Sequence, residues 1–196
     1  NRSSDLTREN IMKEKFRQKI LKLRKEFEKD GLSKFNIEIK NKVLNLQEYI
    51  NSNIVCFYVS FESEVQTHDL IKSSLESGKR IIVPYVDKKE IYLSELKNFN
   101  NLDLGKFGIL APKKEFVKPF DITNVEAIII PGIVFDKLGH RIGFGGGYYD
   151  KLLRDSKAIK IALCYDFQLF EKIPYEEHDI PVDIIITEKQ IIRVND

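Results

Sequence analysis

The chain has 196 residues, 42% of them hydrophobic and 32% charged, with a net charge of +2. This composition is typical of a globular domain and excludes a disordered chain and a protein that is basic throughout. No apolar run reaches the roughly 18 to 20 residues that cross a bilayer, and the polar amino terminus has no signal-peptide core. We therefore expect a cytoplasmic protein without a membrane partner. The charge is uneven, because residues 1–42 carry 13 Lys and Arg against 7 Asp and Glu.

The predicted elements alternate between helices and strands. Apolar residues recur at steps of three and four from Met12 to Phe27, which indicates a helix over 6–30 that stops at Gly31. Ser33 is the expected N-cap of a helix over 33–50, and Thr67 that of a helix over 68–77. A fourth helix is predicted at 148–156, and 99–120 is expected to be irregular. Strands are predicted at 54–59, 80–84, 90–93, 126–130, 160–163, 182–186 and 190–194.

Several of these strands are continuously apolar, which is typical of strands buried on both faces of a parallel sheet. The sequence therefore predicts one α/β domain over 6–196, with three layers and a mostly parallel sheet flanked by helices.

Cys56 and Cys164 lie far apart inside apolar runs, and the chain has no Cys-x-x-Cys pattern. We expect both to be buried free thiols, not a zinc site or a redox pair. Residues 1–5 lack an initiator methionine and are set aside.

A glycine-rich run is the most informative segment, because five of the ten glycines lie between Gly139 and Gly147. A predicted strand precedes it and a helix follows, so backbone amides and the helix start can approach a phosphate closely. Arg141 can add a matching charge and a planar set of donors. The run is neither a Walker A loop nor a dinucleotide fingerprint, since Tyr148 stands where the third glycine is needed. A flexible hairpin is the alternative on glycine content alone.

The same segment resembles the signature of the 5-formyltetrahydrofolate cyclo-ligase family. The central match is Pro131-Gly132-x-x-Phe135-Asp136 followed by Gly139-x-Arg141-x-Gly143-x-Gly145-x-Gly147-Tyr148-Tyr149-Asp150. The likeness extends over nearly the whole chain in the right order. Its weaker parts are Lys13-x-x-x-Arg17, the stretch 60–67, Tyr165-x-Phe167-Gln168 and the stretch 178–187.

The resemblance implies an ATP- and Mg²⁺-dependent enzyme that cyclises 5-formyltetrahydrofolate, with or without a polyglutamate tail, to 5,10-methenyltetrahydrofolate through a phosphorylated formyl group. The implied catalytic residues are Arg141 and Asp150, and the implied magnesium ligands are Asp150 and Asp183. The implied folate contacts are Val59, Glu64, Phe144 and Tyr148. The implied ATP contacts are Lys13, Arg17, Arg141, Gly143, Phe144, Gly145, Gly146, Gly147, Tyr148 and Tyr149. Some family members carry a basic residue at the position of Phe144 or Gly146, so phosphate binding here depends more on backbone amides and Arg141.

The chemistry of these side chains is compatible with the implied roles, but each residue also has a simpler structural interpretation. Lys13 and Arg17 share one helix face and can grip a polyphosphate, although a solvated charged face explains such a pair too. Asp150 suits magnesium beside a phosphate, or it complements the helix dipole. Asp183 heads a buried strand, where a carboxylate needs a partner or a metal. Glu64 follows the carboxyl end of a strand, where α/β sheets bind ligands, or is an ordinary loop acid.

Two other functions remain open from the sequence. One is a different phosphate-ligand enzyme, such as a sugar-phosphate isomerase or a CoA transferase. The other is a non-enzymatic folate- or nucleic-acid-binding protein that uses the basic first helix, although interspersed acids and the lack of an RNA motif argue against nucleic acid as a partner. No Ser–His–Asp or Cys–His set is readable, and His178 is left out of the catalytic residues. We expect a monomer.

Overall fold

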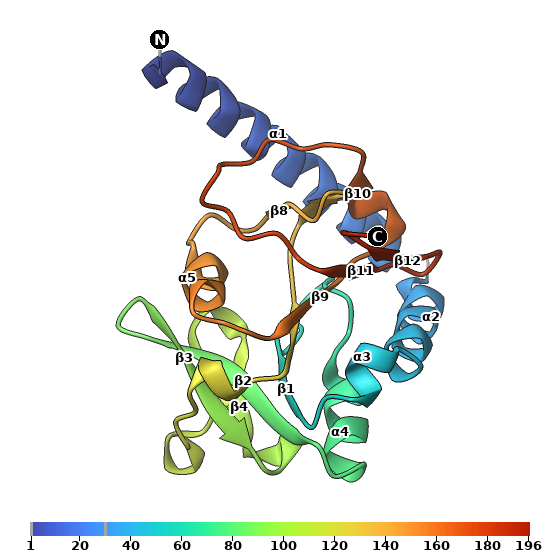
Figure 1. The fold of residues 1–196 in the computed structure, drawn as a ribbon, viewed down its shortest axis with the longest axis vertical. Helices are drawn as coiled ribbons and strands as arrows, with labels where there is room; N and C mark the ends of the chain where they lie inside the picture. The colour runs from blue at the N-terminus through green and yellow to red at the C-terminus, as the bar shows by residue number, and fades with distance from the viewer. Residues whose placement is uncertain (1, 30) are drawn as a thin grey trace.

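A seven-stranded sheet forms the centre of the computed structural model, which describes residues 2–29 and 31–196. The strand order is β12-β11-β9-β6-β1-β2-β3 (Figure 1). The five inner strands are mutually parallel, whereas the edge strands β3 and β12 are antiparallel to their neighbours. The strands are β1 Ile54–Phe57, β2 Arg80–Asp87, β3 Glu90–Leu96, β6 Ala127–Ile130, β9 Ile159–Leu163, β11 Ile184–Ile186 and β12 Ile191–Arg193. The predicted α/β class is thus confirmed.

Both faces of this sheet are covered by helices, as continuously apolar strands require. Alternate residues point to opposite faces, so Phe57 and Ile129 belong to one core cluster while Cys56 and Ile128 belong to another. The first cluster packs under the helices α2 Leu32–Leu44, α3 Gln47–Ile50 and α4 His68–Glu76, and the second packs under α5 Tyr148–Arg154. Cys56 and Cys164 are buried free thiols, as predicted.

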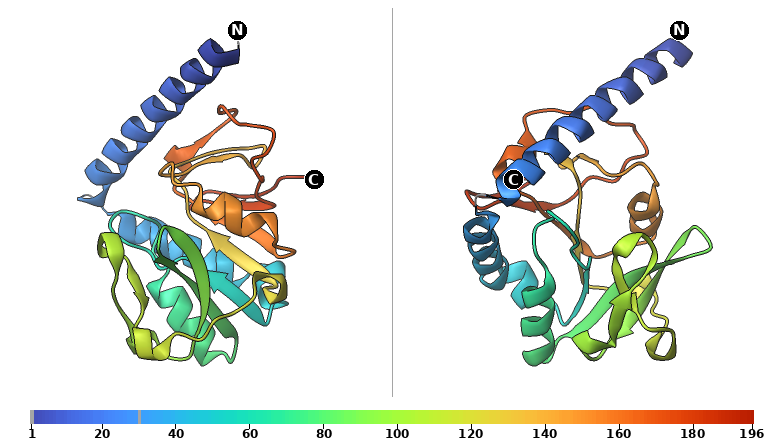
Figure 2. Two further views of the ribbon diagram at one scale, coloured as in Figure 1. Left: turned by 90° about the vertical axis from the view of Figure 1, so that its left-hand side faces the viewer. Right: turned by 180° about the vertical axis from the view of Figure 1, so that it is seen from behind.

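A second, small sheet and the first helix form a separate layer. This sheet has the order β10-β7-β8, with β7 Val134–Asp136, β8 Arg141–Ile142 and β10 Leu169–Phe170. Helix α1, Arg2–Glu28, packs on it through Ile20, which joins Val134 and Ile142 in a third core cluster. The amino-terminal turns of α1 extend beyond the rest of the fold (Figures 1 and 2). The predicted apolar stripe is therefore covered only in part, and Met12 is 48% exposed.

The remaining elements are short. The stretch 99–120, expected to be irregular, contains a hairpin of β4 Leu102–Leu104 and β5 Leu110–Pro112. Single 3₁₀ turns occur at η1 Phe99–Asn101, η2 Lys106–Gly108, η3 Lys114–Phe116, η4 Ile122–Asn124 and η5 Asp166–Gln168. None of the helices in the described part of the chain is both long and apolar enough to cross a membrane.

Three helix predictions differ from the structure. The helix expected over 33–50 is broken after Leu44: Asn45 is the C-cap, its backbone N–H and its side-chain amide both donate to the Asn41 carbonyl, and Leu46 is extended. Ser33 is not an N-cap, because α2 begins one residue earlier, after Gly31. Thr67 does occupy the N-cap position of α4, but its hydroxyl donates to the Tyr58 carbonyl at 2.7 Å instead of capping the helix. Residue 30, the expected end of the first helix, lies outside the described residues.

Candidate active site

The glycine loop, residues 143–147, connects β8 to α5 near the carboxyl edge of the main sheet. Gly145 has a φ of 100° and Gly147 one of 68°, both in the left-handed region that side chains disfavour. A Cβ at Gly146 would lie 2.7 Å from the Tyr148 ring. The sequence therefore folds into a tight, solvent-exposed loop whose backbone a ligand can approach. Because α5 has only seven residues, side-chain cations carry more of the positive charge here than the helix dipole.

Arg141 precedes this loop and is deeply buried, with only 8% of its side chain exposed. Its Nη2 donates to Asp150 Oδ1 at 3.3 Å, and its guanidinium lies over the Tyr149 ring at 5.4 Å. Its Nε is buried without a hydrogen-bond partner among the described residues. Burial lowers the pKa of Arg141, while the charges of Asp150 and Asp179 raise it. A buried donor without a partner is costly, so this position favours an anionic ligand.

Helix α1 brings the two predicted phosphate-binding cations to the glycine loop. The Nε of Arg17 donates to the Gly143 carbonyl at 2.6 Å, across 126 positions of sequence. Its Nη2 lies beside Gly145, 3.7 Å from where a Cβ would stand. One turn earlier, Lys13 Nζ is 3.6 Å from Glu176 Oε1. The structure thus places Lys13 and Arg17 on the side of α1 that faces the body of the protein, so a purely solvated face does not describe this pair.

Glu64 is buried in the loop between β1 and α4. Its Oε1 accepts a hydrogen bond from the Phe61 backbone N–H at 3.0 Å. Burial raises the pKa of Glu64 to about 7, although the bond from Phe61 and the charge of Arg24 lower it. Arg24, itself buried, donates from Nε to Ser63 Oγ at 3.0 Å and so attaches α1 to this loop. Glu64 is therefore a neutral or titrating carboxyl near pH 7 and not an ordinary exposed loop acid.

The other predicted folate contacts line the same region. Val59 is buried just after β1. Phe144, in the glycine loop, is exposed, and its ring centroid lies 6.4 Å from that of Phe61. Tyr148 is half-buried at the start of α5. The Phe61–Phe144 pair joins the loop after β1 to the glycine loop with two aromatic rings. Phe61 was not predicted, because a single loop phenylalanine gives no sequence signal.

Asp183 is not brought together with Asp150. Its Oδ2 accepts a hydrogen bond from the Lys160 backbone N–H at 2.8 Å, where β9 and β11 begin. Arg141, by contrast, reaches the carbonyl of Pro131, just beyond the carboxyl end of β6 in the same parallel sheet. The half-buried Asp183 carboxylate therefore has a backbone N–H as its partner. No hydrogen bond or ion pair of the described residues joins Asp183 to Asp150, and their shared binding of one magnesium ion stays a prediction.

Two carboxylates that the sequence analysis left out lie beside the predicted cations. Glu176 contacts Lys13, and the charge of Asp179 acts on Arg141. Both belong to the stretch 171–183 between β10 and β11. Only the position of His178, next to Asp179 in the family-like stretch 178–187, could have directed attention there.

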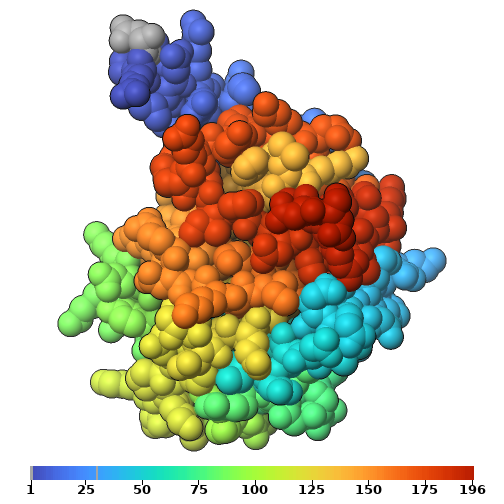
Figure 3. Space-filling view, viewed as in Figure 1, coloured from blue at the N-terminus to red at the C-terminus, as the bar shows by residue number. Residues whose placement is uncertain are grey.

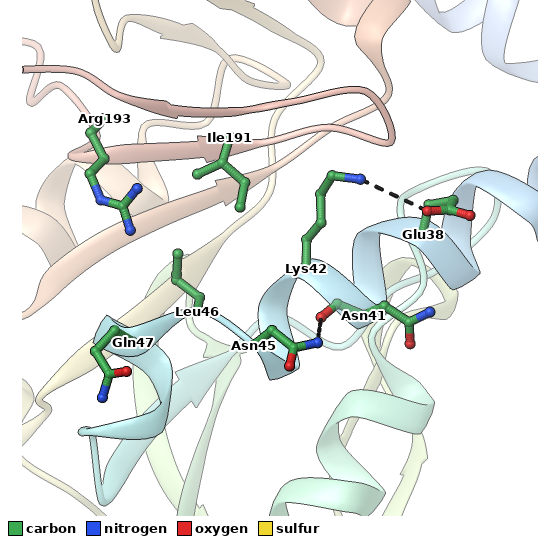
Figure 4. Close-up of a pocket in the computed structure, with 8 residues that line it drawn as sticks. All are labelled: Glu38, Asn41, Lys42, Asn45, Leu46, Gln47, Ile191 and Arg193. Carbon is green, nitrogen blue, oxygen red and sulfur yellow. Dashed lines mark hydrogen bonds and ion pairs between the residues drawn. The ribbon is translucent and has the colours of Figure 1, made fainter.

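A groove of about 370 Å³ lies elsewhere, between α2, α3 and β12 (Figure 4). Its cations already have partners, since Lys42 donates to the Glu188 carbonyl at 2.8 Å and Arg193 donates to Glu48 at 2.9 Å. We therefore place the candidate active site at the glycine loop, where a buried donor lacks a partner, and assign no ligand to this groove.

The fold and these contacts define an α/β protein with a cationic ligand site at the carboxyl edge of its sheet. The model of the 5-formyltetrahydrofolate cyclo-ligase family matches residues 9–188. The NMR structure of 5,10-methenyltetrahydrofolate synthetase from Aquifex aeolicus is 34% identical, with a TM-score of 0.85 and 94% of each chain covered. The 5-formyltetrahydrofolate cyclo-ligase of Escherichia coli K12 is 27% identical over 156 residues, which are 76% of this chain and 86% of that relative.

A probable 5-formyltetrahydrofolate cyclo-ligase of Schizosaccharomyces pombe is 31% identical over 176 residues, covering 81% of this chain and 86% of the relative. The chain belongs to the 5-formyltetrahydrofolate cyclo-ligase family. This confirms the family resemblance of the sequence, and it argues against the isomerase and transferase alternatives.

Proposed function

We propose that the protein uses ATP to cyclise 5-formyltetrahydrofolate to 5,10-methenyltetrahydrofolate, with release of ADP and phosphate. The observation that carries this proposal is the environment of Arg141. Its buried Nε has no partner among the described residues, and the exposed glycine loop lies next to it. Arg17 is bonded to that loop. Such a set of donors suits the negative charge of a triphosphate.

The reaction needs activation of a poor electrophile. The formyl group is an amide, so its oxygen first takes the γ-phosphoryl group of ATP and the bond from that group to ADP breaks. The second folate nitrogen then attacks the formyl carbon and loses its proton. The C–O bond breaks, phosphate carries away the formyl oxygen, and the new ring is closed. In phosphoryl transfer of this kind the protein contributes alignment and charge stabilisation more than covalent chemistry.

The residues of the site divide between the two substrates. Lys13, Arg17 and Arg141 hold the phosphates together with the backbone of the glycine loop. Glu64 and the Phe61–Phe144 pair face the folate, where aromatic rings offer a stacking surface and a carboxyl near its pKa can donate or accept a hydrogen bond. The two groups of residues meet at the glycine loop, which carries Phe144.

Magnesium is the metal that the family implies, and Asp150 fits it. The Asp150 carboxylate is 34% exposed, lies beside the glycine loop and contacts Arg141. Magnesium keeps several waters and takes one or two carboxylates together with substrate phosphates, so one accessible carboxylate at this position is a suitable ligand. When bound there, the ion would neutralise phosphate charge.

Cytoplasmic location, a monomeric state, polyglutamylated substrate and the absence of a nucleic-acid partner stay predictions.

Product formation tests the proposal directly. With 5-formyltetrahydrofolate, ATP and magnesium, we expect absorbance of the methenyl product to grow, and to stay flat when ATP is omitted. Asp150→Ala should lower the rate by roughly 10²-fold or more, because a phosphate-neutralising ligand is lost. Asp155→Ala, at an exposed position just after α5, removes the same charge and should leave the rate unchanged. Folate binding without product would indicate a non-enzymatic binding protein.

The pKa of Glu64 predicts a pH-dependent stability. This pKa is about 7 in the folded protein against an ordinary value of 4.5. Below pH 4.5 the Glu64 carboxyl is protonated in both the folded and the unfolded protein. As the pH rises to 7, only the unfolded chain releases the proton readily. The free energy of unfolding of the wild type therefore falls by about 3 kcal/mol across this range. The free energy of unfolding of Glu64→Gln, relative to wild type, should therefore increase across this window.

Urea unfolding at the two ends of the window measures this difference. Glu76→Gln, at an exposed position in the last turn of α4, is the matched control and should show the wild-type pH profile. If Glu64→Gln also showed the wild-type profile, the carboxyl would be ionising as it does in the unfolded chain.

A further inference from the structure

The face of helix α1 that lies against the body carries a third cation beside Lys13 and Arg17. Lys13, Arg17, Ile20 and Arg24 lie within about 60° of one another around a regular helix, and all four are partly or fully buried. The amino-terminal turns of α1 protrude beyond the body (Figure 3), so the later turns form this face. Ile20 belongs to the third core cluster. The proposed function uses the first two cations and leaves Arg24 without a role.

Arg24 connects α1 to the loop between β1 and α4. Only 2% of the residue is exposed, and its Nε donates to Ser63 Oγ at 3.0 Å. A charged group at this depth is costly unless it is bonded, so Arg24 is not an ordinary solvated cation of a helix surface. It lies two turns, or about 10 Å along the helix axis, beyond Arg17. One helix therefore contacts the glycine loop through Arg17 and the loop of Glu64 through Arg24.

The loop that Arg24 holds contains a strained backbone position. Glu62 has a φ of 51°, in the left-handed region that residues other than glycine rarely adopt. Such a conformation persists only where neighbouring contacts fix it. Ser63, whose Oγ accepts the Arg24 donor, is the next residue, and Glu64 follows it. The bond from Arg24 is therefore placed to hold the turn that sets the direction of the Glu64 side chain.

Arg24 also dominates the positive charge around Glu64. Burial raises the pKa of Glu64 to about 7; among the charged neighbours, Arg24 lowers this pKa and Glu62 raises it. The other titratable groups that Glu64 faces are Tyr58 and Tyr149. Burial raises the pKa of both phenols well above the ordinary value, so they stay neutral near pH 7. The protonation of Glu64 thus depends on the presence of Arg24.

We propose that Arg24 is a positioning residue, which holds Ser63 and thereby directs the Glu64 carboxyl toward the folate. It acts through Ser63 and not by contact with a substrate. The same helix presents Lys13 and Arg17 to the phosphates, so α1 connects the two halves of the site. This role rests on the proposed function, because that function assigns Glu64 to the folate.

Calorimetric titration with 5-formyltetrahydrofolate in the absence of ATP tests the role. Arg24→Met removes the donor and the charge, and should weaken folate binding by roughly tenfold or more. Ser63→Ala removes the acceptor and keeps the charge. The double variant should bind no more weakly than Arg24→Met, because residues that act through one contact are not additive. Arg8→Met makes the same change at an exposed position of α1 and should bind as wild type does.

The pH dependence of folate binding distinguishes this role from a merely structural one. Since the charge of Arg24 lowers the pKa of Glu64, Arg24→Met should raise the midpoint of this dependence by about one pH unit. Ser63→Ala should leave the midpoint in place, and in the Glu64→Gln background Arg24→Met should cause no shift. If circular dichroism shows Arg24→Met to be unfolded, Arg24→Lys replaces it. That variant keeps the charge but not the Nε donor, so binding should weaken at an unchanged midpoint.

The proposal is overturned if Arg24→Met, or Arg24→Lys in its place, binds folate as wild type does at every pH. It is overturned as well if the effects of Arg24→Met and Ser63→Ala are fully additive, or if Glu64→Gln binds folate as wild type does. ATP-dependent formation of methenyl product by the wild type is measured separately. Folate binding without product would contradict the proposed reaction, and the binding data would still decide the role of Arg24.

Discussion

Arg141→Lys is expected to lower kcat/KM for ATP by roughly 10²- to 10³-fold, the range for loss of a preorganised donor at a site of developing charge. Arginine presents a fixed fork of donors, here to Asp150 and the Pro131 carbonyl, with Nε left for a ligand. Lysine has a single ammonium that cannot make these contacts together. Burial already lowers the pKa of Arg141, and the same burial would disfavour the charged form of a lysine.

Initial rates of methenyl formation at varied ATP concentration measure this effect. Arg154→Lys, at an exposed position in the last turn of α5, makes the same chemical change outside the site and should leave kcat/KM unchanged. If Arg141→Lys retained the wild-type value, Arg141 would be a structural partner of Asp150 and not a phosphate ligand. If kcat/KM for ATP fell while folate bound as it does to wild type, the defect would lie in the binding or use of ATP.

The main sheet could be predicted because its signal is local. Runs such as 81–83 and 128–130 are apolar at every position, which is required of strands covered on both faces. The structure confirms all seven strands of this sheet within a few residues. The small sheet was missed, because β8 and β10 have two residues each and no periodicity can be read from so short a strand. Its stability comes from packing against Ile20 of α1, which is a long-range contact.

In the candidate site, too, the features that are local in the sequence could be predicted and the long-range contacts could not. The glycine loop, Arg141 and Asp150 could be found because they are contiguous, and the steric demands at Gly145 and Gly146 explain why such a string is needed. The contact of Lys13 with Glu176 joins residues at opposite ends of the chain, and no spacing in the sequence encodes it. For the same reason the sequence indicates that Asp183 needs a partner, but not that a backbone N–H supplies it.

Asp136→Ala is expected to lower the free energy of unfolding by about 3 kcal/mol or more, since each donor left unsatisfied in a buried place costs roughly 1 to 3 kcal/mol. Asp136 is fully buried. Its Oδ1 accepts the backbone N–H groups of Leu138 and His140, at 3.0 and 2.9 Å. Its Oδ2 accepts that of Ile173 at 3.1 Å and lies 3.0 Å from His140 Nδ1. One side chain thus closes the turn after β7 and attaches the 171–183 segment to it.

Urea unfolding measures the loss, and Asp103→Ala is the matched control. The Asp103 Oδ1 also accepts a backbone N–H, that of Leu104 at 2.8 Å, but on an exposed strand where water replaces it. Asp136→Asn keeps the Oδ1 acceptor and turns Oδ2 into a donor, so it should disturb Ile173 more than Leu138 and destabilise less than alanine. Equal stability of all three variants would mean that the turn keeps its shape through packing alone. In that case the segment would depend for its position on the Tyr175 ring, which stacks on His140, and on the Val182 N–H, which donates to the Gly139 carbonyl.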